Sequence, residues 1–200
     1  MWSRAALALP IVALLATSTP HDPALAQAWQ CRPSASLPRP VPEFAKAGEV
    51  RRTAIDGYIL ALIWSREHCR GRENNSADAL QCGKSMGEFG FVLHGLWPEA
   101  KGPNYPQWCR KAGLLSREVV AENICMTPSV QLLQHEWAKH GTCVARKPET
   151  YFGAARLLFN ALEFPDMDRL SRRGEKEGTL RGSAPAHCQC AHNDGLSEKA

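Results

Sequence analysis

Two stretches of the chain decide its fold: FVLHGLWP at residues 91–98 and HEWAKHGTC at residues 135–143. A helix over the second stretch, advancing about 100° per residue, would carry four ionisable side chains on one face: His135, Glu136, Lys139 and His140. Imidazoles can give or take protons near neutral pH, and a lysine can neutralise a phosphate. The spacing therefore predicts a helix with a chemically active face, suited to phosphoryl transfer without a metal ion.

A zinc site is the main alternative explanation for these histidines. A zinc-binding helix needs histidines at positions i and i+4, so that both imidazoles converge on one ion. Four positions after His135 comes Lys139, whose charge would repel the metal, and His140 follows one position later. We therefore expect no metal and no cofactor at these residues.

A second metal-binding hypothesis concerns the end of the chain. It rests on four potential ligands within six residues: His187, Cys188, Cys190 and His192. A single short cluster of this kind in an oxidising compartment is more often a disulfide or a tail, so this hypothesis is the weaker one.

The first stretch predicts a strand that ends in a bend. Phe89, Phe91 and Leu93 alternate with other residues, so a strand would bury this set and turn His94 to the opposite face. Upstream, residues 58–64 form a continuous apolar run of strand length. This run predicts a buried central strand.

Two helices are predicted downstream of the strands. Thr127 followed by Pro128 is a good helix start and Gly141 a good stop, so these residues frame the helix with the ionisable face. A second helix is indicated by an apolar stripe of core type: Phe152, Ala155, Phe159 and Leu162. Strands and helices together predict an α+β fold, in which an antiparallel β-sheet is flanked by helices.

Both stretches resemble the active-site motifs of the ribonuclease T2 family of secreted acid ribonucleases. A weaker likeness runs from Tyr58 to Ser65 and through Cys69 and Cys82, so the resemblance covers roughly residues 55–165. It implies the ribonuclease T2-like fold and a metal-independent endoribonuclease. Such an enzyme cleaves single-stranded RNA, but not DNA, by transphosphorylation through a 2′,3′-cyclic phosphate.

The resemblance also implies roles for the ionisable residues. His140 would act as the general base and His94 as the general acid. Glu136 and Lys139 would stabilise the transition state, and His135 would hold the phosphate. Trp97 is the best candidate to stack on a base beside the scissile phosphate, a contact that tolerates different bases and so predicts low base specificity. The alternative for Trp97 is that it packs in the hydrophobic core instead of binding a base. For Trp137 we expect a core position.

The eight cysteines are an even number in a chain that we expect to be exported, which favours disulfides over free thiols or zinc. By resemblance to the family, Cys109 would pair with Cys143, and Cys69 with Cys82. The remaining cysteines stay unassigned at this point: Cys31, Cys125, Cys188 and Cys190.

The chain divides into four predicted regions. Residues 1–26 predict a secretory signal peptide, with an apolar run and small residues before a cleavage point after Ala26. Residues 27–54 form a proline-rich, extended and mobile arm, and residues 55–169 form the catalytic domain. Residues 170–200 form a polar tail that is either mobile and dispensable or a truncated remnant. We expect a secreted or periplasmic monomer that has no membrane contact after the signal is removed.

The formal net charge of +4 is only mildly basic. This charge suits RNA held over a few nucleotides and argues against a protein that coats long nucleic acid. A different class of function stays open: a secreted binding or interaction protein that keeps the fold but is catalytically impaired. The tail motivates this alternative, because no aromatic residue follows Arg169.

Overall fold

The computed structural model describes most of the chain between Ala28 and Met167. The described ranges are 28–29, 31–34, 36–83, 85–164 and 167. The predicted signal peptide, the predicted tail and the cluster at 187–192 lie outside these residues, and so do Cys188 and Cys190.

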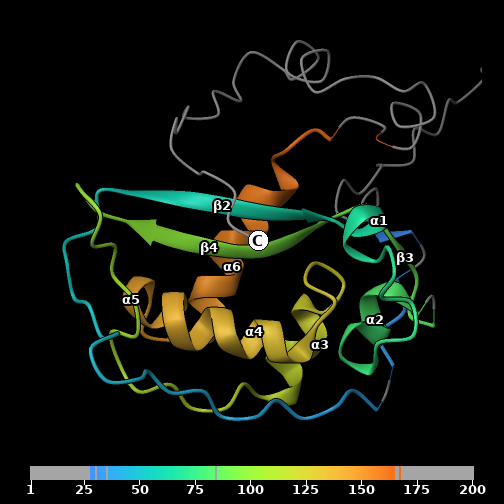
Figure 1. Cartoon of the computed structure of the whole chain (residues 1–200), viewed down its shortest axis with the longest axis horizontal. Coiled ribbons are helices and arrows are strands. Elements are labelled where there is room, and N and C mark those ends of the chain that lie inside the picture. Colours follow the sequence, from blue (N-terminus) through green and yellow to red (C-terminus); the bar gives the residue numbers. More distant parts are fainter. Residues whose placement is uncertain (1–27, 30, 35, 84, 165–166, 168–200) are drawn as a thin grey trace, which may run out of the picture.

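Two strands form the sheet that carries the first motif. Strand β2 (Gly57–Trp64) pairs antiparallel with β4 (Phe91–Glu99), from Gly57 opposite Glu99 to Trp64 opposite Phe91. A second, shorter antiparallel pair joins β1 (Ala28–Trp29) to β3 (Glu88–Phe89). Figure 1 shows β2 and β4 as a twisted ribbon lying across the helices.

The helices lie against this ribbon. The longer ones are α3 (Arg117–Asn123), α4 (Val130–Glu136) and α6 (Pro148–Asn160). A π-helical turn, η2 (Trp137–Gly141), continues α4 and leads into α5 (Thr142–Val144). Three short elements lie beside the far end of β2: α1 (Ser65–His68), η1 (Ser76–Asp78) and α2 (Ala79–Cys82).

The core forms where β4 meets α4, η2 and α6, all of which contact one another or the strand. Its buried side chains include Leu93 and Leu96 from β4, Leu133 and Trp137 from the α4–η2 run, and Phe152 from α6. The α+β prediction is confirmed, and Trp137 is a core residue as expected. No helix among the described residues combines the length and the apolar character needed to cross a membrane.

Strand β2 is less buried than its apolar sequence predicts. Tyr58 is 53% exposed and Ile59 is 42% exposed, and β4 is the strand with which β2 pairs in the described part of the chain. The prediction of a buried central strand was therefore wrong for these residues. An apolar run of strand length does not reveal how many neighbours the strand has.

The helix that carries the second motif begins and ends differently from its predicted limits. Ser129, not Thr127, caps α4, because its side-chain oxygen accepts a hydrogen bond from the N–H of Leu132 at 3.3 Å. The hydroxyl of Thr127 instead donates to the carbonyl of Leu93 in β4, at 2.8 Å. Gly141 does not stop the helical run, which passes through it into α5.

Gly141 is required for packing rather than for termination. A Cβ atom at this position would lie 2.5 Å from the ring of Trp137 and 2.9 Å from the ring of Tyr151, both closer than real side chains approach. The glycine therefore lets the helical run pass close to α6.

Three disulfides join six described cysteines. Cys69–Cys82 and Cys109–Cys143 are the two pairs implied by the family resemblance, and Cys31–Cys125 is the third. Because Cys31 and Cys125 pair with each other, neither of them is free to bridge to Cys188 or Cys190.

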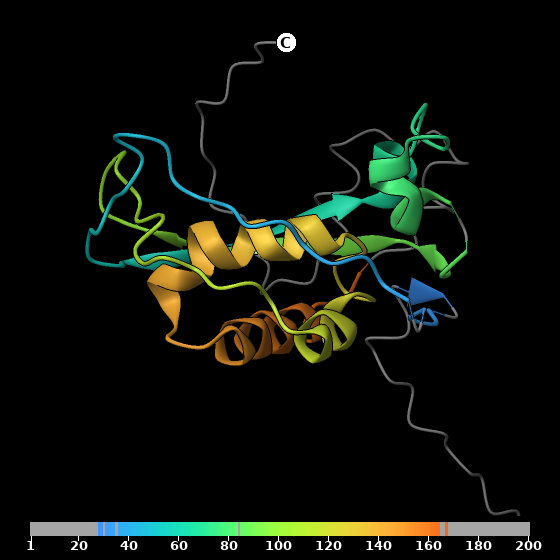
Figure 2. The same cartoon turned by 90° about the horizontal axis from the view of Figure 1, so that it is seen from below.

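The proline-rich arm is extended but not free. Cys31 ties its start to the end of α3, and the backbone of Arg51 exchanges two hydrogen bonds with that of Gln107 at its end. Figure 2 shows this segment, in blue, crossing in front of α4. The expectation of a mobile arm missed these attachments, which proline content does not reveal.

We predict that the Cys31–Cys125 disulfide contributes more to stability than Cys69–Cys82. The two bridges span 94 and 13 residues, and loop-closure entropy assigns them about 4.7 and about 2.9 kcal/mol respectively. Urea unfolding of the Cys31→Ser/Cys125→Ser and Cys69→Ser/Cys82→Ser double variants measures both losses. An equal or smaller loss for the Cys31–Cys125 pair would contradict this ranking.

Candidate active site

His94 lies at a β-bulge in β4. Ala61 of β2 pairs with Gly95 and the next residue, Leu62, pairs with Leu93, so His94 is the extra residue. In a regular strand, residues three apart point to opposite faces, whereas a bulge re-aims the side chains on either side of it. The rings of His94 and Trp97 accordingly lie 5.3 Å apart, edge to face.

Glu136 is buried against this bulge. Its side chain is 2% exposed, and its Oε2 accepts a hydrogen bond from the indole N–H of Trp97 at 2.8 Å. Its Oε1 lies 3.4 Å from Nε2 of His94, which is close enough for an ion pair when His94 is protonated. One carboxylate therefore connects the strand motif to the helix motif.

Gly95 makes this approach possible. A Cβ atom at position 95 would lie 1.8 Å from Oε2 of Glu136 and 2.9 Å from Nε1 of Trp97. No side chain fits in this space, so the carboxylate can occupy it only beside a glycine. The sequence predicts that this strand ends in a bend, whereas β4 continues through Gly95 to Glu99. Neither the bend nor the spacing revealed this contact.

His140 is the buried imidazole of the site. It is 3% exposed, and its ring stacks on Trp97 at 5.6 Å and on Tyr105 at 6.3 Å. Burial, followed by the charges of Lys139, His135 and His94, lowers the pKa of His140 to about 3. His140 is therefore neutral from about pH 4 upward.

Burial divides the four ionisable side chains into two pairs. The members of each pair are four residues apart and so lie on the same side of the helical run. Glu136 and His140 are buried toward β4, whereas His135 and Lys139 are partly exposed. They remain close enough for the charges of Lys139 and His135 to lower the pKa of His140.

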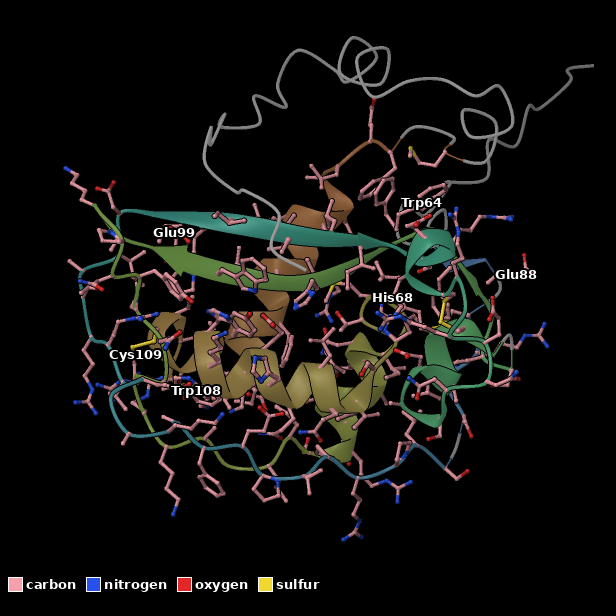
Figure 3. All side chains as sticks on the ribbon, viewed as in Figure 1. Trp64, His68, Glu88, Glu99, Trp108 and Cys109 are labelled. Carbon is pink, nitrogen blue, oxygen red and sulfur yellow. A yellow bond between two sulfur atoms is a disulfide. The ribbon has the colours of Figure 1, made fainter. Side chains whose placement is uncertain are left out.

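His135 lies between the arm and the loop after β4. Its Nδ1 is 2.5 Å from Oε2 of Glu43, and its ring is 5.8 Å from that of Trp108, edge to face. Trp108 has a φ of 54°, which is uncommon for a bulky residue, and its N–H donates to the carbonyl of Lys139 at 2.7 Å. Figure 3 labels Trp108 beside Cys109, the residue whose disulfide to Cys143 holds this loop on the helical run.

Sequence reasoning missed the supporting role of Tyr151 in α6. Its hydroxyl accepts from the N–H of Leu96 at 3.2 Å and donates to the carbonyl of Leu96 at 3.1 Å. Burial and the nearby charge of Glu136 raise the pKa of Tyr151, so the hydroxyl keeps the proton that it donates. Tyr151 was not part of the apolar stripe that predicted α6, and nothing in the sequence pattern indicated its contact with Leu96.

No group of three or more metal-binding side chains occurs among the described residues.

His68, which neither motif contains, is hydrogen-bonded to Asp78 at 3.0 Å. Figure 3 places His68 at the other end of the molecule from Trp108. It is therefore a histidine outside the site and a useful control.

Three imidazoles, a buried carboxylate and a lysine come together on an α+β, disulfide-linked fold, and these are kinds of side chain that acid–base catalysis uses. The model of the ribonuclease T2 family matches residues 55–172, which is more than half of the chain, so the chain belongs to that family.

The chain is also similar to individual ribonucleases. It is 40% identical over 141 residues to a ribonuclease of Aeromonas hydrophila, covering 70% of this chain and 62% of that protein. It is 35% identical over 136 residues to a probable ribonuclease of Haemophilus influenzae, covering 62% of this chain and 49% of that protein. The chain thus spans less than two thirds of the length of these relatives.

One similar solved structure is RNase NT in complex with 5′-AMP, at 27% identity and a TM-score of 0.40, covering 54% of this chain and 57% of that one. Another is an RNase-related protein from Calystegia sepium, at 25% identity and a TM-score of 0.45, covering 61% of this chain and 66% of that one.

We predict that Gly95→Ala lowers the free energy of unfolding by about 3 kcal/mol, because the added methyl group displaces the carboxylate of Glu136. Gly57→Ala in β2 is the matched control, since a Cβ there meets nothing within 4 Å, and it should change stability by less than about 1 kcal/mol. Urea unfolding measures both. The indole N–H resonance of Trp97 should shift only in Gly95→Ala, and an unchanged resonance there would contradict the contact.

Proposed function

We propose that this protein is a secreted, metal-independent endoribonuclease that cleaves single-stranded RNA by transphosphorylation. The observation that carries the proposal is that the rings of His94 and His140 both lie against the Trp97 ring, at 5.3 and 5.6 Å, while the carboxylate of Glu136 connects strand and helix. Three disulfides support export, because such bonds persist in oxidising compartments.

RNA carries its own nucleophile, the 2′-hydroxyl, so the enzyme must remove one proton and supply another. His140 is the general base, and its low pKa supports this role, because a base must be unprotonated before the reaction. The 2′-oxygen attacks phosphorus and the bond to the 5′-oxygen breaks, which gives a 2′,3′-cyclic phosphate and a 5′-hydroxyl. His94 is the general acid that protonates the departing 5′-oxygen, and its side chain is one third exposed.

The remaining ionisable groups act electrostatically rather than by proton transfer. Lys139 and Glu136 stabilise the transition state, and His135 holds the phosphate. Trp97 has two roles in this scheme: its N–H orients Glu136, and its ring stacks on a base with little preference for its identity. We expect the protein to be a monomer. We also expect no cleavage of DNA, because DNA lacks the 2′-hydroxyl.

We predict that the protein cleaves RNA in the presence of EDTA and that His94→Ala and His140→Ala each lower kcat by about 10²- to 10⁴-fold. The double variant should be scarcely worse than either single variant, because both residues serve one transition state. His68→Ala is the control histidine, and it should keep the wild-type rate. Trp97→Ala should raise KM through the lost stacking and also lower kcat, because it removes the N–H that bonds Glu136.

Loss of cleavage on chelation, or efficient cleavage of DNA, would contradict this proposal. So would more than about a tenth of the wild-type activity remaining in His94→Ala. RNA binding without any cleavage by the intact protein would support the alternative of a catalytically impaired binding protein. Analysis of the products for a 2′,3′-cyclic phosphate tests the transphosphorylation step itself.

We predict that kcat/KM stays high down to about pH 4 and falls only as the pH approaches the pKa of His140, about 3. The direction follows from the lowered pKa, because the unprotonated base persists to lower pH than in a free imidazole. The unfolded chain binds this proton below about pH 6.5, so stability also falls between about pH 6.5 and 3. Circular dichroism must show a folded protein at each pH.

The charge of Lys139 provides a test of the cause of this shift. Lys139→Gln removes the second-largest contribution to the low pKa of His140, so the NMR titration midpoint of His140 should move upward. An unchanged midpoint would mean that the charge of Lys139 does not contribute to the low pKa of His140. A wild-type midpoint near 6.5 would contradict the assignment of His140 as an imidazole that is neutral in acid.

A further inference from the structure

The arm before the family-like domain contributes a carboxylate to the site. Oε2 of Glu43 lies 2.5 Å from Nδ1 of His135, and the two side chains are 22% and 34% exposed. Neither active-site motif contains Glu43, which lies 92 residues before His135 in the sequence. The contact therefore exists only because the arm docks along α4.

Gln131 fixes the arm in this position. It lies one helical turn before His135, so both side chains project from the same side of α4. Its amide oxygen accepts from the N–H of Val41 at 2.9 Å, and its amide nitrogen donates to the carbonyl of Val41 at 3.2 Å. The same nitrogen donates to Oε1 of Glu43 at 2.5 Å, so each oxygen of the carboxylate has its own partner on α4.

This network determines which nitrogen of His135 is available. An ionised carboxylate only accepts hydrogen bonds, so the bond to Glu43 places a proton on Nδ1. The other ring nitrogen, Nε2, is then the atom left for a ligand, as in sites where a second residue sets the tautomer of a histidine. The Trp108 ring, edge-on at 5.8 Å, restricts the same imidazole from another side.

We propose that Glu43 is a positioning residue, which orients His135 and fixes its tautomer so that Nε2 binds a phosphate oxygen of the substrate. The inference rests on the proposed ribonuclease function and adds a residue of the N-terminal arm to that site. The alternative is that Glu43 merely anchors the arm. The arm has other anchors nearby, however, because Gln131 holds the backbone of Val41 and Cys31 is disulfide-bonded to Cys125.

The test compares Glu43→Ala with Glu49→Ala in the full-length protein. Glu49 is a carboxylate of the same arm whose Oε2 accepts from the N–H of Lys46 at 2.8 Å. Glu43→Ala should raise KM for RNA and the inhibition constant of inorganic phosphate by about tenfold, with a smaller change in kcat. Glu43→Gln, which keeps an acceptor, should lie between Glu43→Ala and wild type. Glu49→Ala should stay within about twofold of wild type.

Two further measurements separate positioning from anchoring. The ¹⁵N shifts of His135 should report a proton on Nδ1 in the wild type and a changed tautomer ratio in Glu43→Ala, whether or not RNA is cleaved. In a His135→Ala background, Glu43→Ala should have no further effect on phosphate inhibition, because Glu43 acts through His135.

The outcomes distinguish this inference from the proposed function. An additive effect of Glu43→Ala in the His135→Ala background, an unchanged tautomer, or equal effects of the two alanine variants would overturn the role of Glu43. A wild-type protein that does not cleave RNA would overturn the proposed function instead, and the tautomer measurement would still decide whether Glu43 positions His135.

Discussion

The carboxylate of Glu136 lies between the bulged strand β4 and the π-helical turn η2, and most of the site's geometry follows from that contact. A buried carboxylate is strongly unfavourable unless hydrogen bonds replace the lost water. Here the indole N–H of Trp97 bonds one oxygen and His94 lies beside the other. The helix can approach so closely only because position 95 is a glycine.

The backbone of β4 around the bulge is hydrogen-bonded on both edges of the strand: β2 pairs with one edge, and other segments bond the opposite edge. There the N–H of Leu93 donates to the carbonyl of Met126, and the carbonyl of Leu93 accepts from Thr127. Both backbone groups of Leu96 bond the hydroxyl of Tyr151. The segment before α4 and the helix α6 thus satisfy the backbone on either side of His94 and hold the bulged conformation. Residues without a chemical role thereby determine where the acid–base groups lie.

Features with a local cause could be predicted from the sequence, and features with a tertiary cause could not. The apolar stripe through Phe152 and Phe159 predicted α6 because burial on a helix repeats every three to four residues. The bulge at His94 depends on how β2 pairs with β4, and the close approach of Gly141 to Trp137 and Tyr151 depends on how α6 packs against the helical run. The contact of Glu43 with His135 links residues 92 positions apart, and composition alone suggested only a mobile arm.

The environments of the histidines also bear on how a substrate would change them. His94 and His135 are partly exposed, whereas His140 is buried, and the charges of Lys139, His135 and His94 all oppose a proton on His140. Those same charges would attract a phosphodiester. A phosphate bound among them would offset their charge, and the affinity of His140 for a proton would rise, since ligand and proton binding are linked. The free site would then hold an unprotonated base, and the occupied site would make that base stronger at the moment when it must accept the 2′-hydroxyl proton.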